Sequence, residues 1–130
     1  MKYLQSMRKY IIIMTLLSTL FGVKAQQTDA IKILSASEFR EAIAKKNVQL
    51  VDVRTAREFK GGAIKGALNI DYFQQENFNA EFNKLDKEQP VYLYCHSGNR
   101  SKKAAAKLDA LGFKKIYDLK GGYMKWPYKK

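Results

Sequence analysis

The sequence predicts an α/β domain with a central parallel sheet of about five strands and helices on both of its faces. Short runs rich in β-branched and aromatic residues alternate along the chain with longer segments of helical periodicity, which is typical of strands joined by crossover helices. The chain has 130 residues, of which 46% are hydrophobic. That is enough for one domain with a packed core and too little for two.

Five runs are predicted to be strands. The two clearest are Val48–Val53 and Val91–Tyr94, which are β-rich and of the length expected for buried strands. The other three are shorter and cover residues 31–33, 67–70 and 115–117.

Three helices are predicted between these strands. Ser35 followed by Glu38 forms a capping box, which predicts a helix over residues 37–45. A second helix is expected at residues 77–85, where apolar residues recur at helical spacing. The third covers residues 101–111 and precedes a glycine, the residue favoured just beyond a helix C-terminus.

Residues 1–25 have the layout of a secretory signal peptide. A basic start precedes an apolar run from Ile11 to Val23, and small residues occupy the two positions of Val23-Lys24-Ala25 that a signal peptidase recognises. The run is shorter than the roughly 20 apolar residues of a membrane-spanning helix; an uncleaved signal anchor is the alternative. We expect residues 26–130 to be exported to the periplasm or secreted, without stable membrane association after the signal is removed.

The chain is strongly basic, with a formal net charge of +12. Four of its 24 Lys and Arg residues and none of its 12 acidic residues lie in residues 1–25, so residues 26–130 carry +8. This charge suits small anionic substrates. The basic residues are scattered and are not interleaved with aromatic residues, so no nucleic-acid partner is expected.

Cys95 is the only cysteine in the sequence. It cannot form a disulfide within the chain, so it is either a buried bystander or a free reactive thiol. Its position after a predicted strand favours the reactive thiol, because ligands of α/β sheets bind beyond the carboxyl ends of strands. The following loop, which contains Gly98 and Arg100, closes onto a predicted helix N-terminus. Backbone N–H groups and the helix dipole favour an ionised thiol there.

Three motifs occur in order along the chain. The Cys-x-x-Gly-x-Arg-Ser segment at residues 95–101 resembles the active-site loop of the rhodanese family. The other two are Leu-Val-Asp-Val-Arg at 50–54 with Glu-Phe at 58–59 and Gly-Ala-Ile-x-Gly-Ala-x-Asn-Ile at 62–70, and Leu-Lys-Gly-Gly at 119–122 with Trp126. The resemblance covers residues 31–127 and implies a parallel α/β fold with a covalent persulfide intermediate on Cys95.

The resemblance implies a sulfurtransferase that needs no metal and no organic cofactor. Cys95 would take a sulfane sulfur from a small anionic donor such as thiosulfate and pass it to a thiol or cyanide-like acceptor. Arg100 is the second catalytic candidate, and its two possible roles, stabilising the substrate and stabilising the loop, have equal support. The residues expected to bind the substrate are His96, Ser97, Gly98, Asn99 and Ser101, and those expected to support the loops structurally are Asp52, Arg54 and Glu58.

Some side chains near the loop have competing interpretations. His96 is expected to face solvent, because adjacent side chains in a curled loop diverge. Lys102 and Lys103 either attract an anionic donor or form a solvated helix face. Trp126 is expected to be a core or rim aromatic residue. Ala63 stands where the family often has His, and we expect that difference to affect the surroundings of the site and not the loop itself.

Three other functions compete with sulfur transfer. A rhodanese-like module could carry sulfur or bind a partner without turnover. A thiol-redox protein would need an external thiol, because the chain has no second cysteine. A cysteine phosphatase would need five residues between its cysteine and arginine, and only four separate Cys95 from Arg100. The shorter loop is better matched to a single added sulfur atom than to a phosphoryl group.

Overall fold

A five-stranded sheet in the order β1-β5-β4-β2-β3 forms the centre of the molecule, and every pairing in it is parallel. The structure, a computed structural model, describes residues 29–129, so the predicted signal peptide lies outside the described residues. The strands are β1 Ile31–Leu34, β2 Gln49–Asp52, β3 Leu68–Asn69, β4 Val91–Tyr94 and β5 Ile116–Leu119. The predicted fold class is confirmed.

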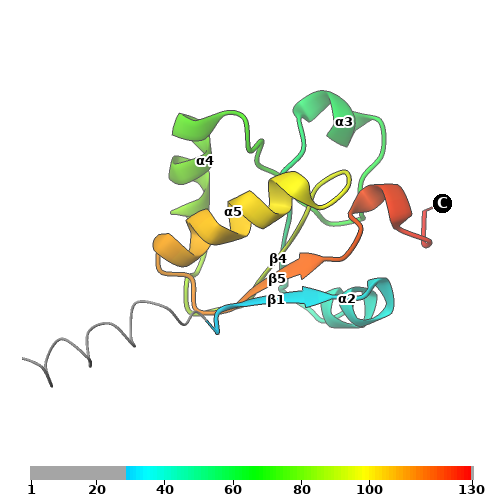
Figure 1. The fold of residues 1–130 in the computed structure, drawn as a ribbon, viewed down its shortest axis with the longest axis horizontal. Coiled ribbons are helices and arrows are strands. Elements are labelled where there is room, and N and C mark those ends of the chain that lie inside the picture. The colour runs from blue at the N-terminus through cyan, green and yellow to red at the C-terminus, as the bar shows by residue number, and fades with distance from the viewer. Residues whose placement is uncertain (1–28, 130) are drawn as a thin grey trace, which may run out of the picture.

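Helices cover both faces of this sheet (Figure 1). Helices α4 and α5 lie on one face, and α2 lies on the other. The helices are α2 Ala36–Ile43, α3 Ala56–Lys60, α4 Gln75–Phe82 and α5 Asn99–Ala110, followed by the 3-10 turn η1 Tyr123–Lys125. Within residues 29–129, none of the helices has the length and apolar character needed to cross a membrane.

Alternate side chains of the central strands supply two separate cores. On the α4/α5 face, Val51 and Leu93 pack with Phe78 and Leu108 from the helices. On the α2 face, Leu50 packs with five further buried residues: Phe39, Ile64, Tyr94, Leu119 and Trp126. A strand buried on both faces needs apolar side chains in both directions, which is why β4 is a continuous Val-Tyr-Leu-Tyr run and why β2 has the adjacent apolar pair Leu50 and Val51.

The register brings the carboxyl ends of the inner strands together. Asp52 of β2 pairs with Tyr94 of β4, and Leu93 of β4 pairs with Asp118 of β5. The residues that follow these strands therefore meet at one edge of the sheet. Cys95, which follows β4, lies between the other two strand ends.

The predicted helices 37–45 and 77–85 are observed as α2 and α4 with bounds shifted by one to three residues, and two further differences lie beside the cysteine loop. Helix α5 begins at Asn99 and not at residue 101, because the positive φ of Gly98 (113°) completes the turn within four residues of Cys95. Helix α3 was not predicted, although Thr55 and Glu58 form the same capping box as Ser35 and Glu38 do at α2. With five residues, α3 is too short to show a helical apolar stripe.

Candidate active site

Cys95 lies at the carboxyl end of β4, in a curled loop that closes onto the N-terminus of α5. Its side chain is buried, with 1% of its surface exposed. The Gly98 backbone N–H donates to Cys95 Sγ at 3.0 Å, and the thiol lies 3.4 Å from the hydroxyl of Ser101, which is fully buried. An N–H donor and the positive end of a helix dipole both favour negative charge on the sulfur.

The C-terminal segment holds this loop from the opposite side. Tyr123 N–H donates to the Cys95 carbonyl at 2.8 Å, and Met124 N–H donates to the His96 carbonyl at 2.9 Å. Gly122 precedes them with a φ of 64°, and a Cβ there would lie 2.5 Å from the His96 carbonyl oxygen. The Gly-Gly pair of the C-terminal motif thus lets two backbone segments approach closely.

The Arg100 guanidinium forms a bidentate ion pair with the carboxylate of Glu58 in α3. Its Nη1 and Nη2 donate to the two carboxylate oxygens at 2.7 and 2.9 Å. These hydrogen bonds lower the pKa of Glu58 to about 2, against the opposing effect of burial, and they raise the pKa of Arg100. The guanidinium remains beside the loop, but Glu58 partly balances its charge.

Asp52 and Arg54 form a second ion pair, which is buried beneath the loops. The Arg54 Nη2 donates to Asp52 Oδ2 at 2.6 Å and to the Gly62 carbonyl at 2.7 Å. Arg54 Nε and the Arg54 backbone N–H also donate to the Asp52 carboxylate. This network ties the end of β2 to the loop that precedes β3, which is a structural role.

The remaining predicted residues divide by exposure. His96, Ser97 and Asn99 are exposed, whereas Gly98 is half-buried. Lys102 and Lys103 are exposed in the first turn of α5. Trp126 is 7% exposed and packs edge-on against Phe39 at a centroid distance of 6.1 Å. Of the residues predicted to bind the substrate, the structure places Gly98 and Ser101 in direct contact with Cys95 Sγ.

Asp118 is a site neighbour that the sequence analysis did not select. It lies on β5 next to β4, is 5% exposed, and its Oδ1 has no hydrogen-bond partner among residues 29–129. Burial raises the pKa of its carboxyl to about 6, while the Ser101 hydroxyl and the Leu119 backbone N–H act in the opposite direction. The sequence did contain a signal for this residue: Asp118 is an acidic residue within an otherwise apolar strand. That strand, β5, neighbours the strand that precedes Cys95.

A buried thiol in a curled loop, at a helix N-terminus and at the carboxyl edge of a parallel sheet, defines a cysteine-centred α/β domain. Comparison with known families agrees with this class: the model of the rhodanese-like domain matches residues 35–129. The chain belongs to the rhodanese-like domain family.

Similar proteins include named sulfurtransferases. The chain is 34% identical over 95 residues to the thiosulfate sulfurtransferase GlpE of Shewanella oneidensis, covering 73% of this chain and 91% of the relative. It is 43% identical over 100 residues to the uncharacterized protein YqhL of Bacillus subtilis, covering 77% and 75%. The solved structure of the human single-domain sulfurtransferase TSTD1 matches with a TM-score of 0.64 and 28% identity, covering 75% and 96%.

Proposed function

We propose that this protein is a sulfurtransferase that moves sulfane sulfur from an anionic donor such as thiosulfate to a nucleophilic acceptor through a Cys95 persulfide. The observation that carries the proposal is the contact of Gly98 N–H with Cys95 Sγ, 3.0 Å, at the N-terminus of a 12-residue helix. This contact stabilises an anionic sulfur without a metal or a neighbouring base. The similarity to a thiosulfate sulfurtransferase supports the choice of donor.

The first half-reaction loads the cysteine. The Cys95 thiolate attacks the outer sulfur of thiosulfate and forms a new S–S bond. The S–S bond within thiosulfate breaks, and sulfite leaves with its electron pair. The added sulfur then carries the negative charge, and the curled loop and the α5 N-terminus lie beside it.

The second half-reaction returns the cysteine to its starting state. A thiolate or cyanide acceptor attacks the outer sulfur of the persulfide, and the Cys95–sulfur bond breaks with its electron pair returning to Sγ. The Ser101 hydroxyl, 3.4 Å from Sγ, can rotate from the Gly98 carbonyl to donate to the thiolate. Both steps balance without an oxidant or a reductant.

The charge around the loop supports an anionic donor. Arg100 lies beside the loop, and Lys102 and Lys103 are exposed on the first turn of α5. Neither lysine forms an ion pair among the described residues. Exposed cations near a concave site raise the local concentration of anions.

Sulfite release from thiosulfate tests this function. We expect continuous release when cyanide or a thiol is supplied, and an intact mass increased by one sulfur atom when no acceptor is supplied. Cys95→Ser is the matched control, because it replaces sulfur by oxygen with little change in shape and should abolish both signals. A single stoichiometric release with acceptor present would favour a carrier without turnover, and near wild-type turnover by folded Cys95→Ser would exclude the covalent route.

A further inference from the structure

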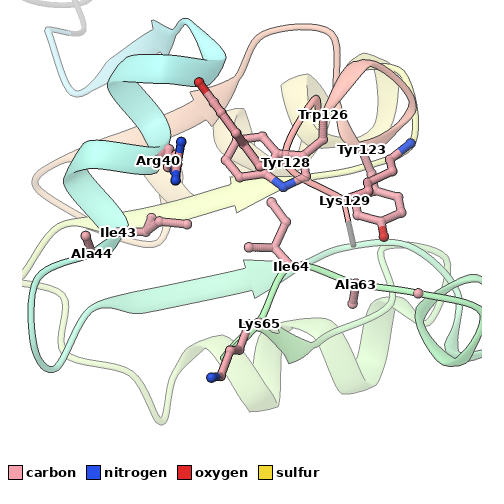
Figure 2. A pocket seen from close by; sticks show the side chains of 11 residues that line it. Arg40, Ile43, Ala44, Ala63, Ile64, Lys65, Tyr123, Trp126, Tyr128 and Lys129 are labelled. Carbon is pink, nitrogen blue, oxygen red and sulfur yellow. The ribbon is translucent and has the colours of Figure 1, made fainter.

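A cavity lies on the α2 face of the sheet. Its volume is about 470 Å³, and no residue of the segment 95–101 lines it. Three segments that are distant in the sequence form its walls: α2, the loop before β3 and the C-terminal segment (Figure 2). Cavities of roughly 300–1,000 Å³ are typical of small-molecule sites.

The interior of this cavity is apolar and aromatic. Ile64 and Trp126 line it, and each is only 7% exposed. The Tyr128 ring lies against Trp126 with centroids 4.9 Å apart and an interplanar angle of 77°. Figure 2 shows the Trp126 and Tyr128 rings above Ile64 and Ala63. Two aromatic rings opposite aliphatic side chains form a surface suited to a flat, apolar molecule.

The charges that line the cavity are all positive. Arg40, Lys65 and Lys129 line it, and no acidic residue does. The ion pairs found among residues 29–129 include none of these three cations. The Arg40 guanidinium lies 4.2 Å from the Tyr128 ring centroid, and Lys129 Nζ lies 4.5 Å from that of Tyr123. Figure 2 shows Arg40 beside Tyr128, with Lys65 extending away from the rings.

We propose that this cavity binds a planar aromatic anion, such as an aromatic carboxylate or sulfonate of small-molecule size. The aromatic rings and Ile64 would contact the flat part of the ligand, and the Arg40 guanidinium, which lies over the Tyr128 ring, would lie beside its charge. Ala63 lines the cavity with a small side chain. No residue of the segment 95–101 lines this site, although Tyr123 both lines it and donates its backbone N–H to the Cys95 carbonyl, and the proposal does not depend on the proposed function.

Trp126 allows a direct test, because it is the only tryptophan in the sequence and it lines the cavity. The probe is 8-anilinonaphthalene-1-sulfonate, which accepts excitation energy from a nearby tryptophan. We expect saturable energy transfer from Trp126 with one probe bound per chain. The matched neutral probe is N-phenyl-1-naphthylamine, which has the same ring system without the sulfonate. We expect it to bind about tenfold or more weakly, the loss that removal of one charge pairing produces.

Three variants complete the design. Ala63→Phe should abolish saturable transfer by filling the cavity, and Arg40→Gln should weaken sulfonate binding about five- to tenfold while leaving the neutral probe unaffected. Lys114→Gln removes the same charge at an exposed position that does not line the cavity, and should bind like the wild type. Cys95→Ser should also bind like the wild type, which separates this site from the sulfur site.

Several outcomes would overturn the proposal. They are equal affinity for the sulfonate and the neutral probe, equal losses in Arg40→Gln and Lys114→Gln, or unchanged binding by Ala63→Phe. Circular dichroism confirms folding of each variant. If Ala63→Phe does not fold, the surface variant Arg40→Gln and the two probes still decide between specific binding and nonspecific attraction.

Discussion

Arg100 shows most clearly what side-chain placement adds at the scale of single residues. The spacing of the loop predicts that the positive charge of Arg100 lies beside the sulfur. The structure shows that both Nη atoms of Arg100 donate hydrogen bonds to the Glu58 carboxylate. Glu58 was expected to support the loops together with Asp52 and Arg54. It contacts the cysteine loop through Arg100, whereas Asp52 and Arg54 form their own buried pair. A sequence pattern gives the residues of such a network but not their pairing.

Replacing Arg100 by Ala should weaken sulfur transfer without abolishing it. The Gly98 N–H and the α5 N-terminus still stabilise the sulfur anion, while the lost charge is worth about 1–3 kcal/mol, a roughly ten- to hundredfold loss in kcat/KM for thiosulfate. Glu58→Gln keeps the Arg100 charge and should lose less activity. Steady-state kinetics of both variants check this, and complete inactivity of a folded Arg100→Ala protein would contradict it.

Asp118 should make the stability of the protein depend on pH. Burial raises the pKa of its carboxyl from 3.8 to about 6, so the folded protein holds this proton more tightly than the unfolded chain does. The stabilising contribution is complete below about pH 4 and is lost as the pH rises towards 6. Asp118→Asn removes this dependence, so the variant should gain stability relative to the wild type between pH 4 and pH 7.

Urea unfolding at the two pH values measures that difference. The exposed Glu88 offers the matched control, Glu88→Gln, which removes one carboxylate at the surface. Only a pH-dependent difference larger than that of Glu88→Gln is assigned to the buried Asp118 carboxyl. A difference for Asp118→Asn that stays constant between pH 4 and pH 7 would show that the buried carboxyl does not titrate in this range.

At the scale of elements, the sequence predicts the strands and helices well where a physical signal is strong. The Ser35–Glu38 capping box and the apolar run of β4 correspond to observed elements. The Thr55–Glu58 box gives an equally good start signal for α3, but five residues leave no periodicity to support it. The position of the cysteine loop could also be predicted. Its contact with η1 could not, because that contact consists of backbone hydrogen bonds, which residue types do not encode.

A side chain at Gly122 should disrupt the backbone hydrogen bonds between η1 and the cysteine loop. A Cβ at Gly122 would lie 2.5 Å from the His96 carbonyl oxygen, at a φ of 64°. Gly122→Ala should therefore displace the loop, reduce thiosulfate turnover by more than about tenfold and lower the melting temperature. Gly66→Ala is the matched control, because Gly66 also has a positive φ, 88°, but nothing lies within 4 Å of a Cβ there.

Gly66→Ala should lose only the stability that a strained backbone costs, about 1 kcal/mol, and keep its turnover. Differential scanning fluorimetry and the sulfite assay separate the two effects. Equal turnover in the two variants would mean that the close approach of Gly122 to His96 does not shape the loop.

At the scale of the whole molecule, the predicted signal peptide, residues 1–25, ends before the described fold begins at residue 29. The first interstrand contact involves Ala30, whose carbonyl accepts from Ile116 N–H at 2.8 Å, and β1 begins at Ile31. Cleavage after Ala25 would remove no residue that takes part in the described fold. We therefore propose that the functional protein is residues 26–130, exported with all five strands and the complete cysteine loop.

Processing should depend on the small residue at position 25. Signal peptidases require small side chains at the first and third positions before the cut, here Ala25 and Val23, and tolerate most residues between them. Ala25→Arg should therefore block cleavage and leave the chain membrane-bound with Met1, whereas Lys24→Gln should be cut as efficiently as the wild type. N-terminal sequencing of the exported protein should find Gln26 first. A membrane-bound wild-type chain that retains Met1 would identify an uncleaved anchor, and a cut at the same site in Ala25→Arg would show that the recognition site lies elsewhere.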